Sequence, residues 1–150
     1  MTESPTPDIA VLGGGAWGSA LAVLAGRAGR TPVLWARHPA RTKLADPGIP
    51  VTGELAEALA PVVLLAVPAA AIRAVAADWR RAGGRGVRVI CAKGFDPGTG
   101  RLLSDVLEED APDDPVAVLS GPTFAAEAAR GVPTAATVAS GDAEVHLGVT

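Results

Sequence analysis

Short apolar runs recur along the chain, separated by polar or glycine-rich stretches. Each run is continuous rather than alternating, which is typical of strands covered by helices on both faces of a sheet. Segments of helical character, rich in alanine and leucine, lie between the runs. The pattern predicts strands at residues 8–13, 31–36, 61–68, 87–92, 115–120 and 133–139, and helices at 16–29, 54–60, 70–83, 99–110 and 122–131.

The alternation of strand and helix predicts the fold class. Strands that alternate with helices build an α/β domain with a doubly wound, mostly parallel sheet and helices on both faces. We expect residues 1–7 to be a disordered leader and residues 8–150 to form a single domain. No fixed-period repeat is visible, so the repeating unit is the strand–helix–strand unit itself.

Composition narrows the classes of function. The chain is 49% hydrophobic and 19% charged, which allows a sizeable core, and its net charge of −3 provides no general attraction for nucleic acid. Cys91 is the single cysteine, so no internal disulfide can form. The first residues lack the features of a signal peptide, and no apolar run approaches the roughly 20 residues that span a bilayer. We therefore expect a cytoplasmic protein with no membrane insertion, no nucleic-acid partner and no metal site.

A glycine-rich stretch lies at the first predicted strand–helix junction. "GGGAWG" follows the strand at residues 8–13 and places Gly13, Gly15 and Gly18 in the spacing G-x-G-x-x-G. In dinucleotide-binding folds, the first glycine allows the tight turn, the second lets a diphosphate approach the backbone, and the third lets helix and strand pack closely. This context favours a dinucleotide site over a glycine-rich turn without a ligand. Trp17 either packs at the edge of the domain or contacts the cofactor.

The end of the second predicted strand bears on which dinucleotide binds. Sites for NAD usually carry an acidic residue about 20 residues after the glycines. Here the strand ends in Arg37 and His38, and the first acidic residue after them is Asp46. A guanidinium can bind the 2′-phosphate of NADP, which a carboxylate would repel. Arg37, helped by His38 or Arg41, therefore favours NADP, with NAD still possible; the alternative is that these are ordinary solvated charges.

Three further motifs carry a family resemblance. "LLAVPA" at 64–69, "CAKGFDPGTGRLLSDVL" at 91–107 and "LSGPTFAAEAARGVPTAATVAS" at 119–140 follow the glycine stretch and "VLWAR" in order. Together they resemble the N-terminal domain of the bacterial-type NAD(P)-dependent glycerol-3-phosphate dehydrogenases over about residues 8–141. The resemblance implies a Rossmann-like, dinucleotide-binding domain over residues 8–150, incomplete at its C-terminus.

The resemblance also implies roles for individual residues. The cofactor-binding positions would be Gly13, Gly15, Ala16, Trp17, Gly18, Arg37, His38, Pro68, Lys93 and Ala125, and the substrate-binding positions Lys93, Gly121 and Thr123. The residues support part of this independently. Lys93 follows a predicted parallel strand, where open α/β sheets bind ligands, in a chain with eleven arginines and only two lysines. The alternative for Lys93 is an ordinary surface lysine in a loop.

The reaction implied by the resemblance is reversible hydride transfer between NAD(P)H and dihydroxyacetone phosphate, which gives sn-glycerol 3-phosphate for phospholipid synthesis. Family members continue into a helical domain that carries the acid/base lysine, so we expect no catalytic residue in this chain, and a homodimer only in the full-length form. Two alternatives remain: a non-catalytic module that senses NADP, and the cofactor half of another dehydrogenase of the hydroxyacid or ketopantoate type.

Overall fold

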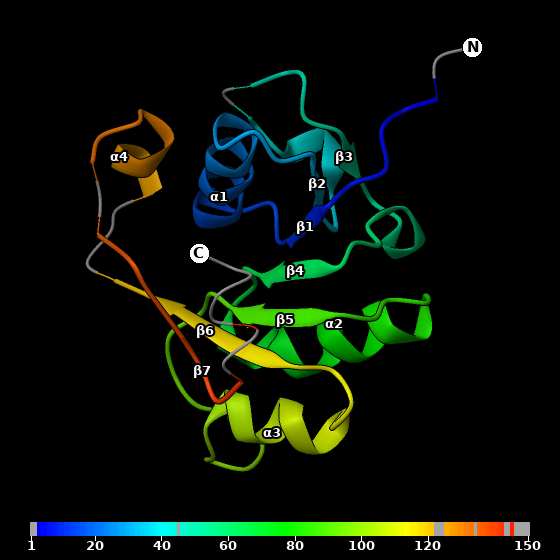
Figure 1. Cartoon of the computed structure of the whole chain (residues 1–150), viewed down its shortest axis with the longest axis vertical. Helices are drawn as coiled ribbons and strands as arrows, with labels where there is room; N and C mark the ends of the chain where they lie inside the picture. The colour runs from blue at the N-terminus through cyan, green and yellow to red at the C-terminus, as the bar shows by residue number, and fades with distance from the viewer. Residues whose placement is uncertain (1–2, 45, 122–124, 134, 143–144, 146–150) are drawn as a thin grey trace.

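A seven-stranded sheet organises the computed structural model, which describes residues 3–44, 46–121, 125–133, 135–142 and 145. The strand order is β3-β2-β1-β4-β5-β6-β7 (Figure 1). The strands are β1 (Ile9–Leu12), β2 (Pro32–Trp35), β3 (Val51–Thr52), β4 (Val62–Leu65), β5 (Val87–Ile90), β6 (Val116–Ser120) and β7 (Thr137–Ser140). All neighbouring strands are parallel except β6 and β7, which are antiparallel. The predicted doubly wound, mostly parallel sheet is confirmed.

Helices cover both faces of the sheet. The helices are α1 (Ala16–Arg27), α2 (Ala69–Arg81), α3 (Leu103–Asp110) and α4 (Ala125–Ala129). Helices α1 and α4 pack together on one face, and α2 and α3 pack together on the other (Figure 1). Each face has its own apolar cluster: Leu21 and Val23 of α1 belong to one, and Ile72 and Trp79 of α2 to the other. This burial on both faces explains why the strands lack an apolar–polar alternation.

Two predicted helices differ from the structure. Residues 54–60 form only a 3₁₀ turn at Leu55–Glu57. Thr52 accepts a hydrogen bond from the Glu54 backbone and donates one to Glu57, and Pro61 disfavours helical backbone just before it. Too few residues therefore remain for a stable helix.

The helix predicted at residues 99–110 begins only at Leu103. The Asp96 carboxylate accepts hydrogen bonds from the Thr99 backbone and hydroxyl at 3.0 and 2.7 Å, which holds a turn at residues 96–101. Gly100 lies in the left-handed region, with φ of 70°. Phe95 and Leu102 form an antiparallel bridge across this turn, so the chain is not helical there.

The edges of the sheet also differ from the prediction. Strand β3 was not predicted, because only two of its residues pair with β2. The strand predicted at 133–139 is β7 at Thr137–Ser140, which runs antiparallel to β6. Helix α4 is described from Ala125 onwards, within the predicted range of 122–131. Among the described residues, no helix is long and apolar enough to cross a membrane.

Candidate functional site

The residues predicted to bind cofactor or substrate gather along one edge of the sheet. One row of paired residues crosses five neighbouring strands: Trp35, Leu12, Leu65, Ile90 and Val118. Three residues further along each strand come His38, Gly15, Pro68, Lys93 and Gly121. The parallel strands all end at this edge, so the sheet brings together residues that are distant in sequence. Open α/β sheets bind ligands outside these carboxyl ends.

The glycine loop lies at the point where the strand order reverses. From β1 the chain continues to β2 on one side, while β4 pairs with β1 on the other. Connections therefore leave this point in opposite directions, and a crevice forms at such a topological switch. Gly15 follows β1 and Pro68 follows β4, the two strands that pair at this switch. Pro68 is exposed and begins α2 as its N-cap residue.

The three motif glycines have different surroundings. Gly13 has φ of 131°, and a Cβ there would lie 2.4 Å from the Ala66 carbonyl oxygen. A Cβ on Gly18 would lie 1.8 Å from the Gly13 carbonyl oxygen. A Cβ on Gly15 would meet nothing within 4 Å. Gly13 and Gly18 are therefore required by the fold, whereas the outer side of Gly15 is open to a ligand.

Helix α1 has a free N-terminus beside that open side. Gly15 is the N-cap residue, no side chain caps the helix, and its first turn carries no acidic residue. The unpaired N–H groups and the helix dipole therefore favour an anion. Ala16 is exposed in this first turn, and Trp17 is half-buried and packs against the apolar cluster on the α1 face. An anionic group such as a diphosphate fits the backbone of this loop.

A hollow of about 400 Å³ adjoins the glycine loop. It brings Gly15 and Ala16 together with Ala125 of α4, so these three predicted residues lie at one site. Arg41 and Lys43 line the same hollow. Sequence reasoning did not single out Lys43; the available signal was that only two lysines occur beside eleven arginines.

Arg37 and His38 follow β2 after Ala36 and do not line this hollow, and both side chains are exposed. The backbone N–H of Ala36 donates to the Thr52 carbonyl at 2.9 Å, which fixes the end of the strand before them. Within the described part of the chain, no carboxylate forms an ion pair with Arg37. Asp46, the first acidic residue after the strand, accepts a hydrogen bond from the Gly48 backbone at 2.9 Å.

Lys93 lines a separate hollow of about 280 Å³ at the ends of β5 and β6. Its side chain is exposed, and Ser120 lines the same hollow. Gly121 directly follows β6, and a Cβ there would lie 2.5 Å from the Ala135 carbonyl oxygen, so a side chain would not fit. The structure therefore places Lys93 and Gly121 at the ends of adjacent strands. Thr123, the third predicted substrate residue, lies outside the described residues.

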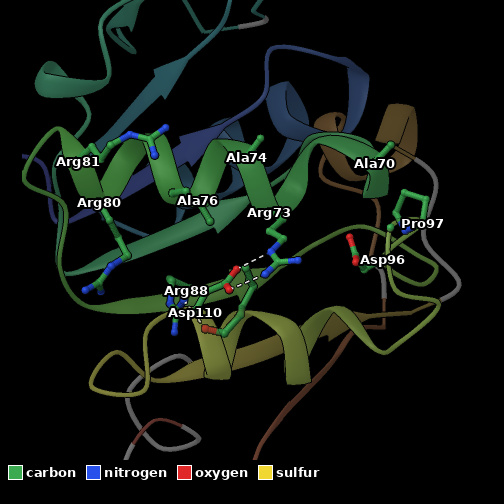
Figure 2. A pocket seen from close by; sticks show the side chains of 13 residues that line it. Ala70, Arg73, Ala74, Ala76, Arg80, Arg81, Arg88, Asp96, Pro97 and Asp110 are labelled. Carbon is green, nitrogen blue, oxygen red and sulfur yellow. Dashed lines mark hydrogen bonds and ion pairs between the residues drawn. The ribbon is translucent and has the colours of Figure 1, made fainter.

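A larger groove of about 740 Å³ is lined by residues of α2 and α3 and by the loop at Asp96, and Figure 2 shows the ion pair of Arg73 with Asp110 there. Arg73 forms a two-pronged contact with Asp110 at 2.7 and 2.8 Å. Arg80 pairs with Asp114, and Arg81 with Asp78. Because Arg73, Arg80 and Arg81 are each paired with a carboxylate, they offer a phosphate group little attraction.

Strand β5 and the residue after it place two ionisable groups in the core on opposite faces of the sheet: Arg88 beside this groove and Cys91 in the apolar cluster of the α1 face. Arg88 of β5 is buried and donates to the backbone carbonyls of Leu107 and Ala111 at 2.8 and 2.9 Å, and to that of Asp114. Burial, together with the nearby charge of Arg80, lowers the pKa of Arg88. Burial also raises the pKa of the Cys91 thiol to about 12, so this cysteine is an inert core residue.

Comparison with known proteins identifies the family. Residues 8–146 match the model described as NAD-dependent glycerol-3-phosphate dehydrogenase N-terminus. The chain belongs to this family. Its dehydrogenase relatives include a glycerol-3-phosphate dehydrogenase [NAD(P)+] of Rhodospirillum rubrum, 49% identical over 152 residues that cover 89% of this chain and 44% of the relative. A glycerol-3-phosphate dehydrogenase [NAD(P)+] of Rhodopseudomonas palustris (strain BisB5) is 44% identical over 154 residues, which cover 92% of this chain and 47% of that relative.

Solved structures show the same relationship. The crystal structure of a glycerol-3-phosphate dehydrogenase from Coxiella burnetii superposes with a TM-score of 0.81 at 27% identity, over 97% of this chain and 50% of that one. The chain thus spans about half the length of the glycerol-3-phosphate dehydrogenases that it matches. The family match decides against the hydroxyacid and ketopantoate alternatives.

Proposed function

We propose that this chain is the cofactor-binding half of an NAD(P)-dependent glycerol-3-phosphate dehydrogenase and that its glycine loop holds the diphosphate of the dinucleotide. The observation that carries the proposal is the contrast among the glycines: Gly13 and Gly18 are closed by backbone, while Gly15 is open beside the uncapped N-terminus of α1. A diphosphate fits this arrangement in both shape and charge.

The end of β2 supports a preference for NADP. Arg37 and His38 are exposed where the ribose of the adenosine would lie, and the Asp46 carboxylate is engaged in its own loop. A guanidinium binds a phosphate with two parallel hydrogen bonds, whereas a 2′-hydroxyl offers it little. NADP is therefore the favoured cofactor, and the NAD(P)+ in the names of the relatives allows both forms.

The ends of β4, β5 and β6 would form the substrate side of the site. Pro68 would border the nicotinamide ribose, and Lys93 would contact both cofactor and substrate. The compact ammonium of Lys93 suits a hydroxyl or phosphate group of glycerol 3-phosphate or dihydroxyacetone phosphate. Gly121, at the end of the adjacent strand β6, would lie beside Lys93 in this wall, and Thr123 would complete it.

The bound cofactor would supply the hydride, and the residues of this chain would supply position and charge. Lys93 would hold the anionic substrate at the carboxyl edge, while the glycine loop would hold the diphosphate of the cofactor. The acid/base group for the reacting oxygen would come from the half of the glycerol-3-phosphate dehydrogenases that this chain does not match. Alone, the chain should bind the dinucleotide and turn over little or no substrate.

Calorimetric titration of the 150-residue chain with NADPH and with NADH tests the proposal. We expect both to bind, NADPH more tightly, and Arg37→Gln to weaken NADPH roughly tenfold while NADH binding stays unchanged, because a charge-assisted contact contributes about 1.5 kcal/mol or more. If the folded wild-type chain bound neither dinucleotide, the proposed function would be wrong. An equal loss for both cofactors in Arg37→Gln would contradict the role given to Arg37.

A further inference from the structure

The segment after β2 folds back onto the glycine loop. Residues Pro39–Arg41 form a 3₁₀ turn, and the Thr42 backbone N–H donates to the Pro39 carbonyl at 3.0 Å. The Thr42 side chain then lies against Gly14: a Cβ on Gly14 would be 2.6 Å from the Thr42 hydroxyl oxygen. This contact fixes the position of Thr42 relative to the loop.

The two residues that flank Thr42 are cations, and both face the loop. Arg41 and Lys43 line the hollow of about 400 Å³ that also contains Gly15 and Ala16. Both side chains are exposed, and no carboxylate pairs with either of them in the described parts of the chain. Five arginines elsewhere in the described residues differ in this respect, since each has an acidic partner: Arg30, Arg73, Arg80, Arg81 and Arg101.

The other walls of the hollow carry no charge. They are formed by Ser19 and by small apolar residues of α1 and α4, namely Ala20, Val23, Ala125, Ala126 and Ala129. The charged groups in this lining are therefore both positive, in a chain whose net charge is −3. A local concentration of positive charge next to open backbone N–H groups attracts an anion.

We propose that Lys43, supported by Arg41, contacts the diphosphate bridge of the dinucleotide in the hollow that it shares with the N-terminus of α1. The proposal rests on the proposed function, because it assumes that the glycine loop holds a dinucleotide. Arg37 and His38 do not line this hollow, so the two groups of cations have different tasks. Lys43 binds the diphosphate, which NAD and NADP share, and Arg37 binds the 2′-phosphate, which only NADP carries.

The test compares Lys43→Gln with Lys43→Arg and with Arg30→Gln, each in the 150-residue chain, by titration with NADH, NADPH and ADP. Arg30 is an exposed cation after α1, near the amino ends of the strands, where its guanidinium lies 3.9 Å from the Asp8 carboxylate. Arg30→Gln therefore controls for the general loss of one positive charge. Circular dichroism melting of each variant checks that the fold is intact.

We expect Lys43→Gln to weaken NADH, NADPH and ADP by one common factor, roughly tenfold for a charge-assisted contact. Lys43→Arg should retain most of the affinity, and Arg30→Gln should retain all of it. Unchanged affinities in Lys43→Gln would overturn the inference while leaving the proposed function intact. A loss for NADPH alone would also overturn it, since Lys43 would then bind the 2′-phosphate. A wild-type chain that binds none of the three would refute the proposed function itself.

Discussion

Alanine substitutions at Gly15 and Gly18 separate binding from folding within a single motif. A Cβ on Gly18 would lie 1.8 Å from the Gly13 carbonyl oxygen, whereas ordinary contacts begin at about 3.4 Å. The backbone fixes the position of a Cβ, and the carbonyl belongs to the backbone, so no side-chain rotation can relieve the overlap. Overpacking of this severity costs about 3 kcal/mol or more. For a chain of this size, Gly18→Ala should lower the melting temperature by roughly 6–12 °C.

Gly15→Ala should leave the stability of the fold nearly unchanged and weaken the binding of NADPH instead. Gly15 has φ of −73° and ψ of −176°, which alanine adopts readily, and its Cβ would meet nothing within 4 Å. The smaller entropy of the unfolded chain favours alanine by about 0.4–1 kcal/mol, and the preference for glycine over alanine at an N-cap offsets this. Stability should therefore stay within about 1 kcal/mol of the wild type.

The added methyl group of Gly15→Ala would occupy the side on which the diphosphate approaches. A steric cost of about 1–3 kcal/mol corresponds to a loss of NADPH affinity of roughly 5- to 150-fold. Circular dichroism melting and calorimetric titration with NADPH measure the two effects on the same samples. Wild-type NADPH affinity in a folded Gly15→Ala variant would refute the assignment of the diphosphate to this loop. A wild-type melting temperature in Gly18→Ala would refute the packing argument.

Two further predictions concern the core. Arg88→Met should destabilise the protein by about 1–3 kcal/mol in urea unfolding, because it removes three buried hydrogen bonds and takes the guanidinium donor from the Asp114 carbonyl. The Leu107 and Ala111 carbonyls keep the backbone N–H groups of Ala111 and Asp114 as donors. A loss below about 1 kcal/mol would show that water replaces the guanidinium. Cys91 should react with iodoacetamide at pH 8 about a thousandfold more slowly in the folded than in the unfolded protein. Burial raises the thiol pKa from 9.0 to about 12, which lowers the fraction of reactive thiolate by about that factor. As the pH rises through 9, the Cys91 thiol loses its proton in the unfolded state but keeps it in the folded state, so the free energy of unfolding should fall above that pH. Equal rates of alkylation in both states would contradict the burial of Cys91.

The sequence was a good guide to the parts of the fold set by local patterns. The strands at β1, β2, β4, β5 and β6 were predictable because burial on both faces requires continuous apolar runs. The glycine motif predicted the loop because each of its glycines has a separate physical reason, two of which the structure shows as backbone contacts.

Features that depend on contacts between distant segments were not predictable. The turn at residues 96–101 forms because Asp96 holds the Thr99 backbone and hydroxyl, which overrides the helical character of the segment. Strand β3 pairs through only two residues, which leaves no periodic signal. The position of Lys43 depends on the contact of Thr42 with Gly14, a relation across 28 residues that no spacing rule describes.

The close backbone packing of Gly18 against Gly13, and of Gly13 against the Ala66 carbonyl, has a thermodynamic consequence. Because the bend after β1 is wedged between its own helix and the neighbouring strand, its main chain is ordered before any ligand arrives. The conformational entropy of this bend is lost once, during folding, and none of it is subtracted again from the free energy of association. The glycine loop thus serves as a rigid binding site, and its affinity for a ligand depends on how firmly the pairing of β1 with β4 holds it in place.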